Sequence, residues 1–445
     1  MAAPCLTIRP ACVLCAAIVL WAVATPVGAQ TQDDFFDDSV LHDIRLTLSS
    51  RDWQTLKARA LEDTYYPADL RWRGITIRNI GIRSRGFGSR SSQKPGLRLD
   101  INRYLSNQEF LGLKAFVLDN GFQDPSLIHE SLAMKLYARM GLFVPREAPA
   151  RLFVNEEYAG AYVIVEAVDR TFVSRLFGAL EGGVEDGGYL FEYRWTRIYG
   201  FEYLGPGLEG YAALFEPHTR ETDSMFGLYR PFEQLARAID ESPPDGVLPD
   251  VGRQIDLPGL IRLLAIQNFL GDLDGLVGKW GMANFYFYRF RQDRPAQLIP
   301  WDADLAFVLP TDLSIDYYLD TNVLVRRVMA VPELRRLYLD ALILCAELAM
   351  QPSAGDARGW LELEIERQAS LIEASVFADP VSLHTFEQFE AAITALRGFA
   401  RTRAPFVQCA VAIAIDPDTP RRCTVPTVPP GDPSGPGVPH GHEPR

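Results

Sequence analysis

The segment Leu298-Ile299-Pro300-Trp301-Asp302-Ala303-Asp304 is a short apolar run that ends in two closely spaced carboxylates. A second run, from Asn284 to Arg289, is rich in aromatic residues, which favour strands. We interpret the two runs as neighbouring strands of one hairpin. Asn284 then opens the first strand and Asp302 closes the second, so that both side chains lie at the same mouth of the hairpin.

The residues before the hairpin predict a helix with one apolar face. Over 256–271 the following apolar residues recur at helical spacing: Leu257, Leu260, Ile261, Leu264 and Ala265. Asn268 continues the same face, although the pattern predicts an apolar residue there. The segment Gly271-Asp272-Leu273-Asp274 follows and brings two more carboxylates towards the hairpin. Further helices are predicted over 229–241, 332–350, 358–377 and 384–404.

The first part of the chain has the pattern of a sheet. Apolar and polar residues alternate over 41–48 and 75–82. Shorter strands are predicted over 97–101, 151–154 and 158–168, with one main helix over 126–140. Strands first and helices second indicate an α+β protein, with an antiparallel sheet in 40–168 and a mainly helical part in 169–415.

Both ends of the chain are expected to lie outside this fold. Residues 1–29 contain one charged side chain, an apolar run over 12–24 and small residues before Gln30, which predicts a cleaved signal peptide and an exported protein. The alternative, an uncleaved membrane anchor, needs about 20 apolar residues. Residues 30–39 are polar and acidic and are expected to be a flexible start. The proline-rich residues 416–445 are expected to be a disordered tail.

The cysteines outside the predicted signal peptide are Cys345, Cys409 and Cys423. Disulfides form in exported proteins, so Cys409 and Cys423 are expected to pair and to fasten the tail to the last helix. The alternative is two free thiols. Cys345 lies in an apolar helical run and is expected to be a buried thiol.

Composition and missing motifs exclude several classes of function. The 445 residues are 48% hydrophobic and 23% charged, which is typical of a globular protein. The net charge of −13 argues against a general nucleic-acid coat, because phosphate backbones need excess cation. No zinc-protease, P-loop or serine-hydrolase motif occurs. The four histidines before the tail are His42, His129, His218 and His384, and they show no metal-ligand spacing.

One segment has the opposite charge to the rest of the chain. From Arg71 to Arg103 there are nine basic residues and one acid, a local charge of +8. It contains the basic, glycine-containing run Arg83-Ser84-Arg85-Gly86-Phe87-Gly88-Ser89-Arg90, followed by Lys94. Glycines let a backbone approach a ligand closely, and arginine and lysine side chains bind phosphate. The alternative is a hairpin turn with solvated charges.

The carboxylates around the hairpin suit phosphoryl transfer. That reaction needs one carboxylate to orient the attacking hydroxyl, and Asp or Asn oxygens to hold Mg²⁺. Asp272 and Asp274 compete for the first role, and Asp274 is preferred because Asp272 falls closer to the helix. One alternative is a set of helix-cap and turn aspartates. A more distant one is a glycoside hydrolase that uses Asp272 and Asp302.

These blocks resemble the CotH kinase family, the spore-coat protein H-like atypical protein kinases. The resemblance covers about residues 41–404 and follows the order of the family's blocks. They are 83–98, Leu118-Asp119-Asn120 with Asp124-Pro125-Ser126, 153–160 running into Glu166, 268–274, 284–288 and Ile299 to Asp304. In the N-E-x-Y-x-G block the chain has one extra residue, Glu157.

The resemblance implies a two-lobed, kinase-like fold, with an N-lobe over 40–168 and a C-lobe over 169–415. It implies a catalytic role for Asp274 and Lys94, and Mg²⁺ binding by Asn284 and Asp302. The implied ATP-binding residues are Arg83, Arg85, Gly86, Gly88, Ser89, Lys94 and Glu166. Glu130 is the implied partner that orients Lys94.

The function implied is that of an exported kinase that transfers the ATP γ-phosphoryl group to Ser or Thr hydroxyls of a protein, with Mg²⁺. The alternative is an exported structural or binding module on a kinase-like scaffold, that is, a pseudokinase. A nucleic-acid partner and a membrane span in the mature chain are not expected. Neither the substrate protein nor an oligomeric state is indicated.

Overall fold

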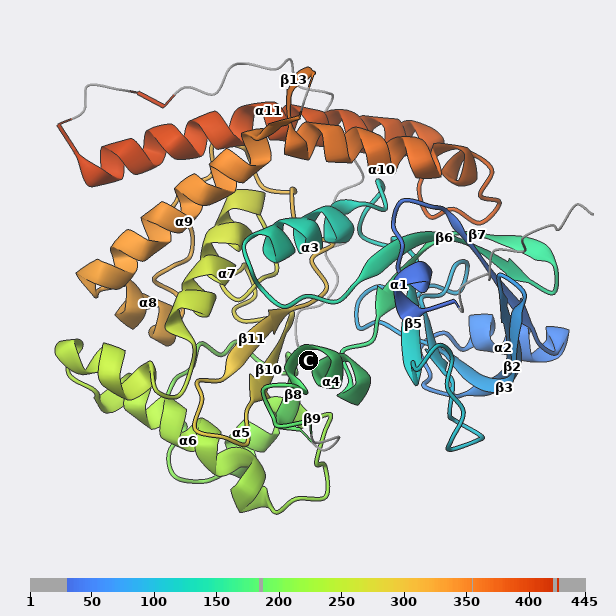
Figure 1. Cartoon of the computed structure of the whole chain (residues 1–445), viewed down its shortest axis with the longest axis horizontal. Coiled ribbons are helices and arrows are strands. Elements are labelled where there is room, and N and C mark those ends of the chain that lie inside the picture. Colours follow the sequence, from blue (N-terminus) through green and yellow to red (C-terminus); the bar gives the residue numbers. More distant parts are fainter. Residues whose placement is uncertain (1–29, 184–186, 354, 419–421, 424–445) are drawn as a thin grey trace, which may run out of the picture.

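The computed structural model describes residues 30–183, 187–353, 355–418 and 422–423 (Figure 1). The predicted signal peptide and all but the first residues of the predicted tail lie outside this part of the chain. The described residues form a mixed α+β structure, in which a strand-rich region is followed by a largely helical one. Among these residues, no helix combines the length and the apolar character that crossing a membrane requires.

The strand-rich region is a closed barrel with the order β1-β2-β3-β4-β5-β7-β6. Its strands are β1 (His42–Thr47), β2 (Tyr66–Trp72), β3 (Ile75–Ser84), β4 (Leu97–Asp100), β5 (Ala115–Asp119), β6 (Glu147–Val154) and β7 (Glu157–Glu166). The prediction of a wholly antiparallel sheet is wrong at one pair, because β1 runs parallel to β6. The β1–β6 pair closes the barrel. The alternation of apolar and polar residues along one strand does not indicate which strands lie beside it.

The start of the described chain is part of the barrel core. Residues 30–39 were expected to be flexible, but they contain the short helix α1 (Gln32–Phe35), which Thr31 caps. The Phe35 ring is fully buried and packs edge-on against Trp72, Phe110 and Phe116. The expectation was wrong because two aromatic residues inside an acidic segment supply enough apolar surface to order it.

The second sheet contains the predicted hairpin. Its order is β11-β10-β8-β9, with β8 (Tyr189–Tyr193), β9 (Phe215–Pro217), β10 (Phe285–Arg289) and β11 (Gln297–Pro300). β10 and β11 are antiparallel, with Phe285 opposite Pro300, which confirms the hairpin. Outward-facing Val117 and Val165 of the barrel share an apolar cluster with Tyr286 and Ile299 of this sheet. The barrel and the second sheet are therefore packed against each other near the hairpin mouth.

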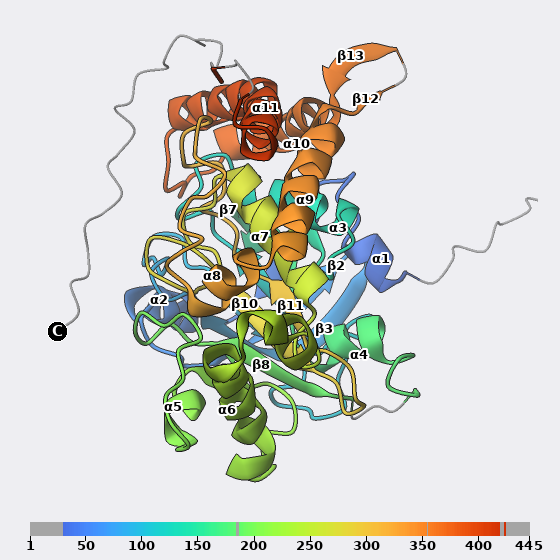
Figure 2. The same ribbon diagram turned by 90° about the vertical axis from the view of Figure 1, so that its left-hand side faces the viewer.

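The helices that follow the barrel's first strands are α2 (Ser50–Ala58), α3 (His129–Arg139), α4 (Arg170–Phe177), α5 (Glu209–Ala212), α6 (Met225–Glu241), α7 (Leu257–Leu270), α8 (Val323–Met329), α9 (Pro332–Met350), α10 (Trp360–Phe377) and α11 (Phe386–Ile415). α2 lies beside β2 and β3 of the barrel, whereas most of the others lie around the second sheet or cover one side of the molecule (Figures 1 and 2). A 3-10 turn (Pro244–Gly246), a π-helical turn (Val247–Val251) and the pair β12 (Pro352–Ser353) and β13 (Asp356–Gly359) complete the described elements.

The polar residue on the apolar face of α7 has a buried partner. Arg403 of α11 is fully buried and donates to the carbonyl and side-chain oxygens of Asn268 and to the carbonyl of Phe269. The last carbonyls of a helix have no partner within the helix, so a buried guanidinium satisfies them. Arg403 therefore fixes the end of α7, from which the Asp272–Asp274 segment leaves.

The cysteine predictions are confirmed. Cys409 of α11 is joined to Cys423 by a disulfide. Cys345 is a free thiol buried in α9, and burial raises its pKa.

Candidate active site

Asp302 lies directly after β11 and is held through its backbone. Its φ of 53° is in the left-handed region, which non-glycine residues adopt at a cost in free energy. Its N–H donates to Glu130 Oε1 of α3 at 2.9 Å. Asn284, which opens β10, is also left-handed, with φ of 56°, and its carbonyl accepts the Trp301 N–H at 3.1 Å. The two residues predicted at the hairpin mouth therefore both have constrained backbones.

Asp274 meets Asn284 at this mouth. Asn284 Nδ2 donates to the Asp274 carbonyl at 3.0 Å and to its Oδ2 at 3.1 Å. The glycine-containing loop between them closes on itself, because the Ala283 N–H donates to the Gly275 carbonyl at 3.1 Å. Burial, and then the carboxylates of Asp272 and Asp302, raise the pKa of Asp274 to about 8. The predicted convergence of Asp274, Asn284 and Asp302 is thus present in the structure.

Asp272 has a different position from Asp274. It is buried, and its Oδ1 accepts the Asp274 N–H at 3.0 Å, so it shapes the turn after α7. Burial raises the pKa of Asp272 to about 6. The half-buried Asp274 is the more accessible of the two carboxylates, in agreement with its preference as the base.

A single guanidinium faces several carboxylates on the barrel side of Asp302. Arg85 Nη1 is 3.8 Å from Asp119 Oδ2, and the guanidinium lies over the Trp301 ring at 5.6 Å. Burial raises the pKa of Asp302, and the Arg85 charge opposes that rise. Burial and the carboxylates of Asp302 and Asp119 raise the pKa of Glu130 well above its usual value.

This donor set fits a divalent cation. The oxygens of Asp302, Asp274 and Asn284 are hard ligands of the kind that Mg²⁺ prefers. Carboxyl groups with raised pKa values lie close together, and a bound cation would relieve their mutual repulsion. The residues present therefore fit the Mg²⁺ that the sequence predicts.

The arginines of the glycine-containing loop between β3 and β4 contact two different groups of carboxylates. Gly86 has φ of 115°, and a Cβ there would lie 2.4 Å from Ser89 Oγ, so only glycine fits. Arg85 reaches the Asp302 cluster, whereas Arg83 and Arg90 both pair with Asp63 on the barrel. The structure thus brings Arg85 to the candidate site and gives Arg83 a role in fastening the loop.

Lys94 has a different partner from the one expected. Its Nζ is 2.9 Å from Asp379 Oδ2, in the turn between α10 and α11, and both side chains are buried. The expected pairing of Lys94 with Glu130 is wrong, because Glu130 accepts the Asp302 N–H instead. The phosphate contact of Lys94 stays a prediction.

Glu166 lies among arginines at the end of β7. Its buried carboxylate accepts hydrogen bonds from Arg146 and Arg175. These two guanidinium groups give it a structural role at the junction of β7 and α4. The nucleotide contact of Glu166 stays a prediction.

Several acidic residues of the site were not among the predicted site residues: Asp119, Asp304 and Glu192. Asp119 ends β5, and Asp304 is the second carboxylate after β11. Glu192 interrupts an aromatic strand, opposite Tyr286 of β10. The common signal is a carboxylate inside or directly after an apolar strand, where a solvated charge is not expected.

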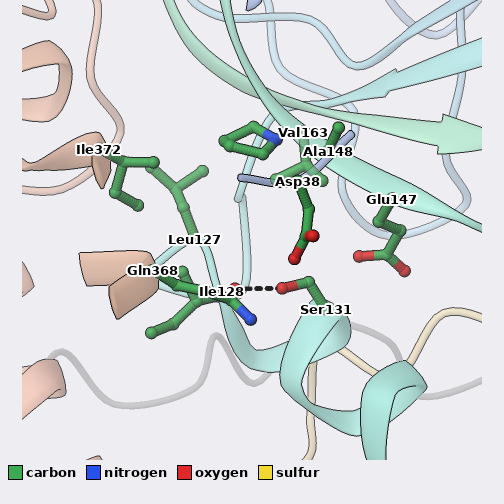
Figure 3. Close-up of a pocket in the computed structure, with 10 residues that line it drawn as sticks. Asp38, Leu127, Ile128, Ser131, Glu147, Ala148, Val163, Gln368 and Ile372 are labelled. Carbon is green, nitrogen blue, oxygen red and sulfur yellow. Dashed lines mark hydrogen bonds between the residues drawn. The ribbon is translucent and has the colours of Figure 1, made fainter. Parts of the chain in front are cut away.

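A small cavity lies between β6, α3 and α10, and Figure 3 shows the carboxylates of Glu147 and Asp38 near the Ser131 hydroxyl there. Glu147 is buried, and neither of its carboxylate oxygens has a hydrogen-bond partner among the described residues. Asp38 pairs with Lys135 and Arg367. Burial, and then the charge of Glu130, raise the pKa of Glu147 well above its usual 4.5.

We expect Glu147→Gln to stabilise the protein increasingly as the pH rises. Because the folded-state pKa is raised, the unfolded chain releases this proton first, and wild-type stability falls as the pH rises above about 4.5. The variant should gain about 1–3 kcal/mol at pH 8 and much less at pH 4. Urea unfolding at both pH values measures this gain. Glu157→Gln, at an exposed position of β7, is the control. An equal gain at both pH values contradicts the prediction.

Comparison with known proteins gives a consistent result. Residues 82–407 match the family model described as CotH kinase protein. The chain is also similar to the inner spore coat protein H of Bacillus subtilis (strain 168), with 22% identity over 374 residues, which cover 82% of this chain and 96% of that protein. The matched range contains the glycine-containing loop, the Asp272–Asp274 segment and the hairpin.

Proposed function

Because the chain belongs to the CotH kinase family, a family of atypical kinases, we propose that it is an exported protein kinase that uses ATP and Mg²⁺ to phosphorylate Ser or Thr hydroxyls of a protein. The observation that carries this proposal is the convergence of Asp274, Asn284 and Asp302 at one hairpin mouth. Export rests on the signal peptide predicted from the sequence. In this proposal the barrel and the helical region are the two lobes of a kinase-like fold.

In this proposal each residue of the site has a separate role in phosphoryl transfer. Asp274 accepts the proton of the attacking hydroxyl, and its Oδ2 is held in place by Asn284 Nδ2. A pKa near the working pH is suited to a general base. Asp302 and the Asn284 side-chain oxygen would hold Mg²⁺, which would neutralise phosphate charge. Arg85 faces the same cluster and contacts the phosphates from the barrel side.

The test is a phosphoryl-transfer assay on the purified mature protein with γ-labelled ATP. The acceptors are casein, as a generic source of hydroxyls, and the protein itself. We expect Mg²⁺-dependent labelling that Asp274→Asn lowers by about 10²–10⁴-fold. Asp293→Asn, at the exposed turn of the same hairpin, should label like the wild type. Labelling by Asp274→Asn at the wild-type rate would overturn the assignment of the base.

A binding module without kinase activity is the second candidate function. The observation that favours it is the buried pairing of Lys94 with Asp379, because a lysine held there is not directed at the Asp302 cluster. Calorimetry with ATP and Mg²⁺ separates the two functions. Nucleotide binding together with transfer supports the kinase, whereas a wild-type protein that neither binds ATP nor transfers phosphate supports the binding module.

A further inference from the structure

Two glutamates and a histidine share one face of the β8–β9 pair. Glu192 on β8 lies directly opposite Glu216 on β9. His218 follows Glu216 by two residues, and alternate residues of an extended chain point to the same side. Their ligand atoms all lie within 4.8 Å of one another, and His218 Nε2 is 2.9 Å from Glu192 Oε2.

Two carboxylates lie opposite each other on this face, and His218, Arg85 and Arg98 lie near Glu192. Like charges directly opposite each other on neighbouring strands destabilise a sheet. Arg194 Nε is 3.5 Å from Glu216 Oε2 and partly compensates the carboxylate charge. Both of these side chains are about half exposed. The side chains of His218 and Glu192 are 27% and 37% exposed, so an ion can reach them from solvent without unfolding of the strands.

The face adjoins the residues proposed to hold Mg²⁺, and Glu192 borders both groups. Glu192 is opposite Tyr286 of β10, and the His218 ring packs edge-on against Tyr286 at 5.6 Å. Asp302 closes strand β11. Burial raises the pKa of Glu192, but His218, Arg85 and Arg98 outweigh this effect and lower it. None of the three residues on this face is in the set proposed to hold Mg²⁺.

We propose that Glu192, Glu216 and His218 form a Zn²⁺ site beside the candidate active site. One imidazole and two carboxylates are a donor set that suits Zn²⁺, whereas Mg²⁺ prefers oxygen ligands alone. Three protein ligands leave a coordination position for water or for an oxygen of a bound molecule. The site requires no kinase activity and is independent of the proposed function.

The test measures binding of Zn²⁺ alone to the full mature chain. The protein carries no polyhistidine tag, and His440 and His442 of the tail are replaced by alanine so that they bind no metal. Calorimetry should give one Zn²⁺ per chain, and His218→Ala and Glu216→Gln should each weaken binding at least about tenfold. Co²⁺ should give a visible absorption band that His218→Ala removes.

Two controls make the result specific. His384→Ala, at a histidine that contacts the carbonyls of Gly121 and Phe122, should bind Zn²⁺ like the parent protein. Asp302→Asn should also keep Zn²⁺ binding, which separates this site from the predicted Mg²⁺ site. Thermal unfolding in EDTA verifies that each variant is folded. The proposal is overturned if the parent binds no Zn²⁺, or if folded His218→Ala and Glu216→Gln bind it equally well.

Discussion

Asp302→Asn is expected to lower phosphoryl transfer by about a thousandfold or more while leaving the protein at least as stable as the wild type. Transfer depends on charge neutralisation at the phosphates, and asparagine removes the carboxylate that would hold the cation. Stability should not fall, because burial and neighbouring carboxylates raise the pKa of Asp302, so its charge is unfavourable in the cation-free fold. Asparagine also tolerates the left-handed backbone at this position.

Thermal unfolding in two buffers measures both parts of this prediction. In EDTA the variant should melt at or above the wild-type temperature. With Mg²⁺ and ATP the wild type should gain stability through ligand binding, and the variant should gain little. Asp293→Asn, at the exposed turn of the hairpin, should behave as the wild type in both buffers. Equal stabilisation of Asp302→Asn and wild type by Mg²⁺ and ATP would contradict the role of Asp302.

Asp379→Ala is expected to lower the free energy of unfolding by about 3–5 kcal/mol. The Lys94 and Asp379 side chains are only 2% and 1% exposed, so the substitution leaves an ammonium group buried without its counter-ion. Asp379 also accepts the N–H groups of Ala161 and Val381 at 3.0 and 2.9 Å. Gly160 is required for this approach, because a Cβ there would lie 2.8 Å from the Asp379 oxygens.

A double variant separates the pairing from the chemistry of Lys94. Lys94→Met with Asp379→Leu replaces both charges by apolar groups and should recover most of the lost stability. Urea unfolding of Lys94→Met, of Asp379→Leu and of the double variant measures the coupling between the two side chains. A double variant no more stable than Asp379→Leu alone would contradict the pairing. ATP binding lost in the folded double variant would support the predicted phosphate contact of Lys94, whereas full activity would assign Lys94 a structural role.

The sequence predicts the hairpin and its polar ends because local signals determine them. Short stretches of sequence are enough to predict the aromatic strands and the helix that ends at a glycine. The carboxylates that follow the helix and the second strand can be read from the same stretches. That is why Asp274, Asn284 and Asp302 could be placed together in advance. The boundaries of α9 agree with the prediction for the same reason, since Pro332 begins the helix.

Long-range pairing explains what the sequence does not predict. No local sequence signal predicts the parallel pairing of β1 with β6. The same holds for the ion pair of Lys94 with Asp379, because its two residues lie far apart in the chain. Glu130 could be found only as an acid on the predicted 126–140 helix, and its partner is a backbone amide rather than a lysine. Glu192, Glu216 and His218 become neighbours only once the β8–β9 register is known.

The hold of Glu130 on the amide of residue 302 has an evolutionary consequence. Every amino acid except proline has that N–H, so this hydrogen bond does not depend on the carboxylate of residue 302. A single-base mutation from aspartate to asparagine keeps both the amide and a residue that accepts the left-handed backbone. If Asp302 holds the cation as proposed, one base change in this chain would remove that ligand and leave the turn at 302 in place.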